Sequence, residues 1–308
     1  MAIERNKLHI GKARRRVRMR SALLLTLGVC WIMAFYRVFN TLNSTGFIWP
    51  THLFGLTLEM LVTLLCFGGG AYLGLCVLDG DHRNILPRGA LSRAQMLWLS
   101  LLGVLLVAPM TLGADVLDRI MYPQWPAAQP FGLYVQAPGV FLLTVVKSAL
   151  LVPVLEELFF RGYLMGALER FGRMRASVVT ALCFAAVHMG GKGGNEVVCL
   201  MYAPMGLLLA ALRLHTSSLL APVLVHACYN LTLIVLSDMG LGWFFENLTL
   251  FTCALRLGLC AAFVYCLRRA WLARGASAQI KPMERLTKKE LALVVAAFVL
   301  VIAAGILG

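Results

Sequence analysis

The chain has 308 residues, of which 60% are apolar and only 14% are charged. Ordinary globular proteins contain about 45–50% apolar and about 25% charged residues, so a water-soluble fold has no interior large enough for this composition. The net charge of +14 does not indicate nucleic-acid binding, because the basic residues gather in short clusters between long apolar runs. The composition therefore indicates a protein that spans a membrane several times.

The apolar runs predict an all-α fold. A transmembrane helix needs about 20 mainly apolar residues, and the runs lack the alternation that is typical of barrel strands. In chain order the predicted spans are 21–39, 53–78, 94–117, 139–168, 176–190, 197–214, 219–239, 248–267 and 290–307. The segment 176–190 is short, and 290–307 would also fit the membrane surface. We therefore expect a polytopic membrane helix bundle of eight or nine transmembrane helices.

The distribution of Lys and Arg predicts the orientation of the bundle. Eight of these residues precede the first span. If that end is cytoplasmic, alternation of the spans places most of the 28 Lys and Arg residues on the cytoplasmic side, as membrane topology requires. The run Leu23–Leu27 after the basic start also resembles a cleaved signal peptide, but no small-x-small cleavage site follows, which favours an uncleaved anchor. We expect a multi-pass protein of the cell (inner) membrane with a cytoplasmic N-terminus.

The densest group of ionisable residues inside a predicted span is Glu156, Glu157 and Arg161. Such residues are costly in a bilayer and mark functional candidates. Glu157 and Arg161 are four residues apart with the acid first, the favourable order for an ion pair within a helix. The pair could simply neutralise itself, but this leaves Glu156 unexplained. We therefore take Glu156 as a candidate general base.

His188 is a second candidate because of its predicted depth. A turn is expected near Gly172, between the fourth and fifth spans, and Glu156 and His188 lie at equal distances along the chain from it. At a rise of 1.5 Å per residue, both lie about 24 Å from the turn in an antiparallel hairpin. A single histidine in an apolar helix can also be a core residue without a chemical role.

His226 and Asn230 form a third candidate group, since their spacing places the imidazole and the carboxamide on one face of a helix. Asn230 could instead only bond a neighbouring helix, as polar residues in membrane bundles do. Taken together, the candidates supply a base, a proton carrier and hydrogen-bond donors, which are the groups needed to add water to a carbonyl.

These residues form three motifs in order, E-E-x-x-x-R, F-x-x-x-H and H-x-x-x-N, which resemble the CPBP family of CAAX proteases and bacteriocin-processing proteins, also called the Abi family. The resemblance covers about residues 139–239, and the stretch EELFFRGYL is similar to prokaryotic members. It implies an intramembrane glutamic endopeptidase without a metal or other cofactor. The implied catalytic residues are Glu156 and His188, which activate water, and His226 and Asn230, which stabilise the oxyanion. Glu157 and Arg161 would support the site.

The resemblance also implies the partners and the domain organisation. The substrate would be a membrane-bound or lipidated protein or peptide, cut near its terminus within the lipid bilayer. We divide the chain into 1–138, with the basic segment and three spans, 139–239, the catalytic core, and 240–308, with the C-terminal spans and a basic loop.

Two other functions are compatible with the same residues. One Glu with two His is a known zinc ligand set, which would fit a zinc-dependent membrane metallopeptidase, although the chain has no H-E-x-x-H motif. The nine cysteines lie in apolar stretches without a C-x-x-C pair, so they indicate neither a cysteine zinc site nor a disulfide framework. A non-catalytic immunity or scaffold protein of the membrane is the second alternative.

Outside the motifs, the sequence predicts two structural features. Glu59, Lys147 and Arg256 should lie at similar depth and form one charge cluster near the outer leaflet, or extend their polar ends to the membrane surface. Gly70 and Gly74 have the small-xxx-small spacing that is typical of closely packed membrane helices.

The expected topology can be tested by thiol labelling. Because the loop 118–138 should be external, a cysteine introduced at Gln129 should react with an impermeant thiol reagent in intact cells. Labelling that occurs only after lysis would show the opposite orientation.

Overall fold

The computed structural model describes the chain at residues 53–77, 87, 89–121, 123, 138–169, 172–188, 196–239, 241 and 249–272. The predicted spans 21–39 and 290–307, the basic N-terminal segment, the C-terminal basic loop and most of the loop 118–138 lie outside the described residues. The predicted orientation of the N-terminus therefore stays a prediction.

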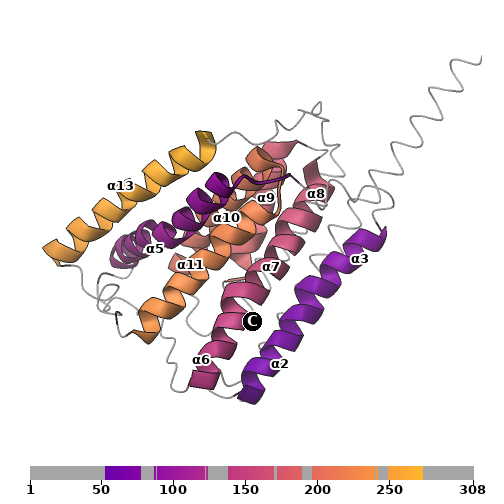
Figure 1. Cartoon of the computed structure of the whole chain (residues 1–308), viewed down its shortest axis with the longest axis horizontal. Helices are drawn as coiled ribbons and strands as arrows, with labels where there is room; N and C mark the ends of the chain where they lie inside the picture. The colour runs from indigo at the N-terminus through magenta and orange to yellow at the C-terminus, as the bar shows by residue number, and fades with distance from the viewer. Residues whose placement is uncertain are drawn as a thin grey trace, which may run out of the picture.

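All elements in the described part of the chain are helices (Figure 1). Short π-helical stretches, labelled η, interrupt two of the long helices. In chain order the elements are α2 (Leu53–Thr63), η1 (Leu64–Gly68), α3 (Gly69–Val77), α5 (Arg93–Met121), α6 (Pro138–Val145), η2 (Val146–Leu151), α7 (Val152–Glu157), η3 (Leu158–Leu164), α8 (Met165–Leu168), α9 (Arg173–Ala186), α10 (Glu196–Thr216), α11 (Leu220–Asp238) and α13 (Leu250–Leu272).

Five helices among the described residues are long and apolar enough to cross a membrane: Leu53–Tyr72, Arg93–Met121, Pro138–Leu168, Leu220–Asp238 and Leu250–Leu272. Each corresponds to a predicted span, whereas the expected number of eight or nine is not confirmed. The predicted spans 176–190 and 197–214 correspond to α9 and α10, which are not among the five. The α9 helix has only 14 residues, fewer than a full crossing needs.

The surface of the bundle is strongly apolar. Leu250, Ile120 and Phe54 expose 90%, 70% and 69% of their surface, and many further large apolar side chains are exposed. So many exposed large apolar side chains are unfavourable in water but suit contact with lipid chains. Together with the apolar helices, it shows a multi-pass membrane protein.

The helices α2 to α3 and α6 to α8 lie side by side and run in the same direction (Figure 1). Near one end, Lys147 donates to Glu59 at 2.7 Å. Near the other end, a Cβ on Gly74 would lie 2.2 Å from the ring of Tyr163. Only a glycine permits this close approach, so the predicted tight packing at Gly74 is confirmed.

A sharp turn separates α8 from α9 at Gly172, which has a φ of 116°. Side chains other than glycine rarely adopt this backbone conformation, and α9 begins at the next residue. The predicted turn at Gly172 is therefore confirmed. The two helices α9 and α10 pack closely, because Gly206 approaches Ala181 so tightly that a Cβ would lie 2.9 Å from its Cα.

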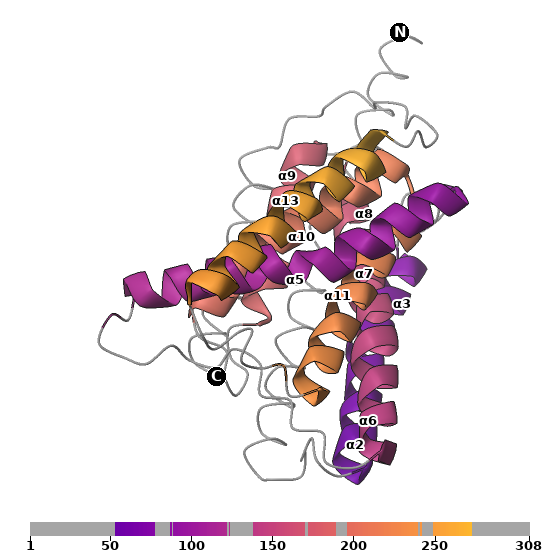
Figure 2. The ribbon, with the colours of Figure 1, turned by 60° about the vertical axis from the view of Figure 1, so that its left-hand side comes forward.

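On the other side of the bundle, α5 packs between α11 and α13 (Figure 2). The α5 helix continues to Met121, beyond the predicted end of its span at 117, and includes the buried Asp118. Arg256 of α13 pairs with Asp115 of α5. The prediction of one cluster of Glu59, Lys147 and Arg256 is wrong, because α13 lies against α5 and its arginine finds a partner there.

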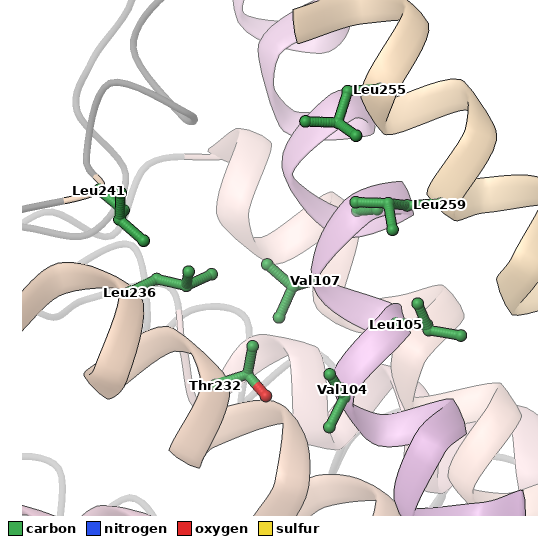
Figure 3. A pocket seen from close by; sticks show the side chains of 9 residues that line it. Val104, Leu105, Val107, Thr232, Leu236, Leu241, Leu255 and Leu259 are labelled. Atoms are coloured by element: carbon green, nitrogen blue, oxygen red, sulfur yellow. The ribbon is translucent and has the colours of Figure 1, made fainter. Parts of the chain in front are cut away.

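An apolar pocket of about 250 Å³ lies among α5, α11 and α13 (Figure 3). Its lining includes Val104, Leu236 and Leu259, with Thr232 as a polar residue. No ionisable side chain lines the pocket, so it offers no acid or base for a reaction.

The pair of Asp115 and Arg256 should be essential for stability. Replacing Arg256 by Met leaves a buried carboxylate without this partner, and breaking a buried pair costs about 3–5 kcal/mol. We expect a clearly lower melting temperature for Arg256→Met in detergent, and partial recovery when Asp115 is also replaced by Leu. The exposed Arg268 on the same helix provides the control, Arg268→Met. Equal melting temperatures for the two single variants would contradict this role.

Candidate active site

The two adjacent carboxylates, Glu156 and Glu157, end α7 in the middle of the long helix formed by residues 138–168. Glu157 is fully buried and Glu156 is 7% exposed. Phe159 and Phe160, which follow on the same helix, belong to the buried apolar core together with Phe184. Charged groups in such surroundings require partners, and the partners differ between the two residues.

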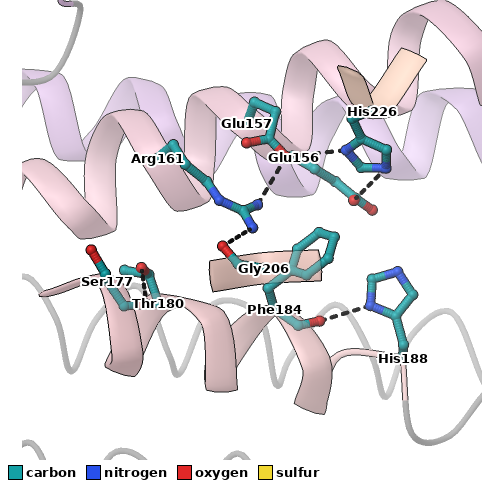
Figure 4. Close-up of polar contacts among 9 residues, drawn as sticks. All are labelled: Glu156, Glu157, Arg161, Ser177, Thr180, Phe184, His188, Gly206 and His226. Atoms are coloured by element: carbon teal, nitrogen blue, oxygen red, sulfur yellow. Dashed lines mark hydrogen bonds and ion pairs between the residues drawn. The ribbon is translucent and has the colours of Figure 1, made fainter. Parts of the chain in front are cut away.

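Glu157 is held by Arg161 from the next turn, with a distance of 2.8 Å between Nη1 and Oε1 (Figure 4). The predicted ion pair is therefore confirmed. Arg161 also donates from Nη2 to the backbone oxygen of Gly206 at 3.1 Å. Its guanidinium carbon lies 4.3 Å from the ring centroid of Phe184. Arg161 thus connects η3 to both α9 and α10.

His226 of α11 lies between the two carboxylates. Its Nδ1 is 3.1 Å from Oε1 of Glu157, and its Nε2 is 3.9 Å from Oε2 of Glu156. The Glu157 carboxylate oxygen can only accept a hydrogen bond, so His226 Nδ1 carries the hydrogen in the 3.1 Å contact. The other ring nitrogen, Nε2, points toward Glu156. The structure brings together Glu156, Glu157 and His226, which come from two different motifs.

His188 follows the end of α9, and the ring of Phe184 contacts both His188 and His226 (Figure 4). The Phe184 ring centroid is 4.9 Å from that of His188 and 5.8 Å from that of His226. His188 Nδ1 lies 2.7 Å from the Phe184 carbonyl oxygen. This oxygen can only accept, so Nδ1 is protonated and Nε2 of the neutral ring keeps its lone pair.

Asn230 is one turn beyond His226, and it donates from Nδ2 to the backbone oxygen of Ser148 at 2.7 Å. The bond to a neighbouring helix, which the sequence left open as an alternative, is therefore present. Ser148 lies in η2, where π-type turns widen the regular backbone ladder. Among the described residues, the second amide hydrogen of Asn230 has no partner.

Sequence reasoning missed the contribution of α10, which carries none of the three motifs. Tyr202 stacks on His188 with ring centroids 3.9 Å apart and an angle of 12° between the planes. Gly206, four residues later, supplies the carbonyl for Arg161. The spacing of a tyrosine and a glycine on one face of an apolar helix was the only available signal.

The carboxylates keep capacity for further hydrogen bonds. Oε2 of Glu156 and Oε2 of Glu157 are both buried and accept no hydrogen bond from the described residues. In the part of the chain that the structure describes, no group of three or more His, Cys, Asp or Glu residues is arranged to hold a metal ion. The geometry provides a carboxylate beside an imidazole, which is a suitable arrangement for moving a proton.

Comparisons with known proteins show what the part of the chain around this site is similar to. Residues 138–232 match the model of the family described as Type II CAAX prenyl endopeptidase Rce1-like. The chain is also similar to the "Putative membrane peptidase YdiL" of Bacillus subtilis (strain 168), with 28% identity over 95 residues. This match covers 30% of the chain and 37% of that relative. No solved structure matches the chain. The resemblance to the CPBP family is thereby confirmed.

The role of Arg161 can be tested by its removal. Arg161→Ala leaves the fully buried Glu157 without its cation, and breaking a buried pair costs about 3–5 kcal/mol. We expect a lower melting temperature, and Arg161→Lys should recover only part of it, because one ammonium cannot also reproduce the planar contact with Phe184. A normal melting temperature for Arg161→Ala would show that the pair does not stabilise the helix.

Proposed function

Because residues 138–232 match the CAAX prenyl endopeptidase family, we propose that this protein is a glutamic endopeptidase that cuts a peptide bond within the membrane. The observation that carries the proposal is the position of His226. Glu157 holds one of its ring nitrogens, and the other nitrogen points toward Glu156 at 3.9 Å. Two neighbouring carboxylates therefore have different surroundings and can take different roles.

In the first step, Glu156 removes a proton from water as the water oxygen bonds to the carbonyl carbon of the substrate. The electron pair of the carbonyl double bond moves to its oxygen and forms an oxyanion. His188 assists through the lone pair of Nε2, which is free because Nδ1 bonds to the Phe184 carbonyl. Glu156 Oε2 is buried and accepts no hydrogen bond from the described residues, so it can accept one from the reacting water.

His226 and Asn230 stabilise the oxyanion in this proposal. Because Nδ1 already carries the hydrogen shared with Glu157, His226 donates from Nε2 as the imidazolium. Asn230 donates the amide hydrogen that Ser148 does not use. Preorganised donors of this kind lower the energy of the transition state because they need no rearrangement during the reaction.

In the second step, the oxyanion electron pair re-forms the carbonyl bond, and the bond to the leaving nitrogen breaks. Glu156 returns its proton to this nitrogen, so the products are a carboxylic acid and an amine. Glu157 and Arg161 are fully buried and bond to each other and to protein groups. They act as positioning residues for His226 and do not need to touch the substrate.

The substrate that suits this site is a membrane-bound or lipidated protein or peptide, because the site lies within a helix long enough to span the bilayer. The test uses the purified full-length chain in phospholipid nanodiscs. It is incubated with a farnesylated peptide that ends in a CAAX sequence and with the same peptide lacking the lipid, and products are identified by mass spectrometry. Cleavage of either peptide supports an endopeptidase. Faster cleavage of the farnesylated peptide than of the unmodified one would show that the enzyme needs the lipid. No cleavage of either would contradict the proposal.

Replacing Glu156 by Gln should abolish this cleavage while the protein remains folded. The amide keeps the shape of the side chain but cannot accept a proton from water, and loss of a general base lowers rates about 10²–10⁴-fold. Asp238→Asn is the matched control, since Asp238 is an exposed carboxylate at the end of α11, outside the site.

The same assay with a chelator separates this mechanism from zinc chemistry. Activity should survive the chelator, because the proposed water is activated by a carboxylate and an imidazole. Activity that the chelator removes and zinc restores would favour a metallopeptidase, and full activity of Glu156→Gln would exclude both mechanisms.

A further inference from the structure

His188 is held by contacts from its own helix and from a second helix, α10. It lies two residues beyond Ala186, where α9 ends. Among the described residues, its side chain forms one hydrogen bond, between Nδ1 and the Phe184 carbonyl. A single hydrogen bond fixes the position of one ring atom, but it leaves the imidazole plane free to rotate about that contact. A productive base must keep both its position and its direction, since misplacement by about 1 Å can reduce a rate about 10²-fold.

The ring of Tyr202 provides the second constraint. It lies nearly parallel to the His188 ring, with 12° between the planes and 3.9 Å between the centroids. Phe184 contacts the same imidazole at an angle of 58°. The imidazole is therefore held by a hydrogen bond and by two aromatic rings, one from its own helix and one from α10.

The helix α10 presents this tyrosine on the same face as Gly206, four residues later. Gly206 is fixed to η3 by the bond from Arg161, at 3.1 Å, and to α9 by its close approach to Ala181. The position of Tyr202 is thus set by the same contacts that hold Glu157 and its arginine.

We propose that Tyr202 is a positioning residue, whose ring holds the His188 imidazole so that Nε2 faces the reacting water. This inference rests on the proposed function of His188 in the endopeptidase. In this proposal the aromatic ring of Tyr202 fixes the orientation of the imidazole. The hydroxyl group of Tyr202 is not required in this proposal.

The experiment compares three variants of the full-length protein in nanodiscs. Tyr202→Phe keeps the ring and removes the hydroxyl, whereas Tyr202→Met replaces the ring by a flexible chain of similar size. Tyr265→Met is the matched control, because Tyr265 is an aromatic residue on α13 that contacts Trp98 at 5.9 Å, away from the site. Tyr202→Leu replaces the Met variant if the latter does not fold.

The first measurement is NMR of the protein labelled in its histidine rings, with the His188 signal assigned by its loss in His188→Gln. An aromatic ring stacked on the imidazole shields the His188 ring proton. We expect this signal to stay in place in Tyr202→Phe and Tyr265→Met and to move downfield in Tyr202→Met. An unchanged His188 signal in Tyr202→Met would overturn the inference, and this result does not depend on any enzymatic activity.

The second measurement is cleavage of the farnesylated CAAX peptide. In Tyr202→Met, kcat should fall about 10²-fold with KM unchanged, because the base is misdirected while the substrate still binds. Tyr202→Phe should keep the wild-type kcat. A loss in Tyr202→Phe as large as in Tyr202→Met would overturn the inference and assign the role to the hydroxyl. If the wild type cuts no peptide, the proposed function fails, and the NMR result alone decides whether Tyr202 holds His188.

Discussion

The arrangement of the bundle depends on the need to neutralise Glu157, a carboxylate with no exposure to solvent. An unpaired charge in such surroundings is strongly unfavourable, so the helices must bring partners to it. Arg161 and His226 both contact the same oxygen, Oε1. Arg161 in turn needs the carbonyl of Gly206, which is within reach only because α9 and α10 pack very closely at this glycine. One buried charge therefore constrains the packing of α9, α10 and α11 around the central helix.

This constraint also separates the tasks of two residues that are adjacent in sequence. Glu157 is bound through Oε1 to Arg161 and His226 and serves as part of the scaffold. Glu156 has an oxygen that accepts no hydrogen bond from the described residues, and it faces the second nitrogen of His226. The two glutamates thus differ in the partners that hold them, because they point in different directions from the helix. The π-helical stretches on both sides of α7 are a frequent feature of functional sites.

Helical periodicity predicted the features that depend on local geometry. The pair of Glu157 and Arg161 follows from their spacing, and the turn near Gly172 follows from the break between two apolar spans. Contacts between distant helices could not be predicted in this way. The partner of Arg256 depends on which helix packs against α13, and Tyr202 belongs to a helix without a motif. The same holds for the bond from Asn230 to a backbone carbonyl, because any residue could supply that carbonyl.

The pair of Asp115 and Arg256 has a consequence for the assembly of the protein during synthesis. The two residues are 141 positions apart, so at about 5–20 residues per second the ribosome needs roughly 7–28 s to make the second after the first. A charged residue at the centre of a helix raises the insertion free energy by about 2.5–3.5 kcal/mol, whereas each Leu, Ile, Phe or Val lowers it by about 0.3–0.6 kcal/mol. The apolar length of α5 can therefore carry Asp115 into the membrane alone. Asp115 therefore lies in the membrane without Arg256 until α13 has been made. Docking of α13 against α5 then forms the ion pair and completes this side of the bundle.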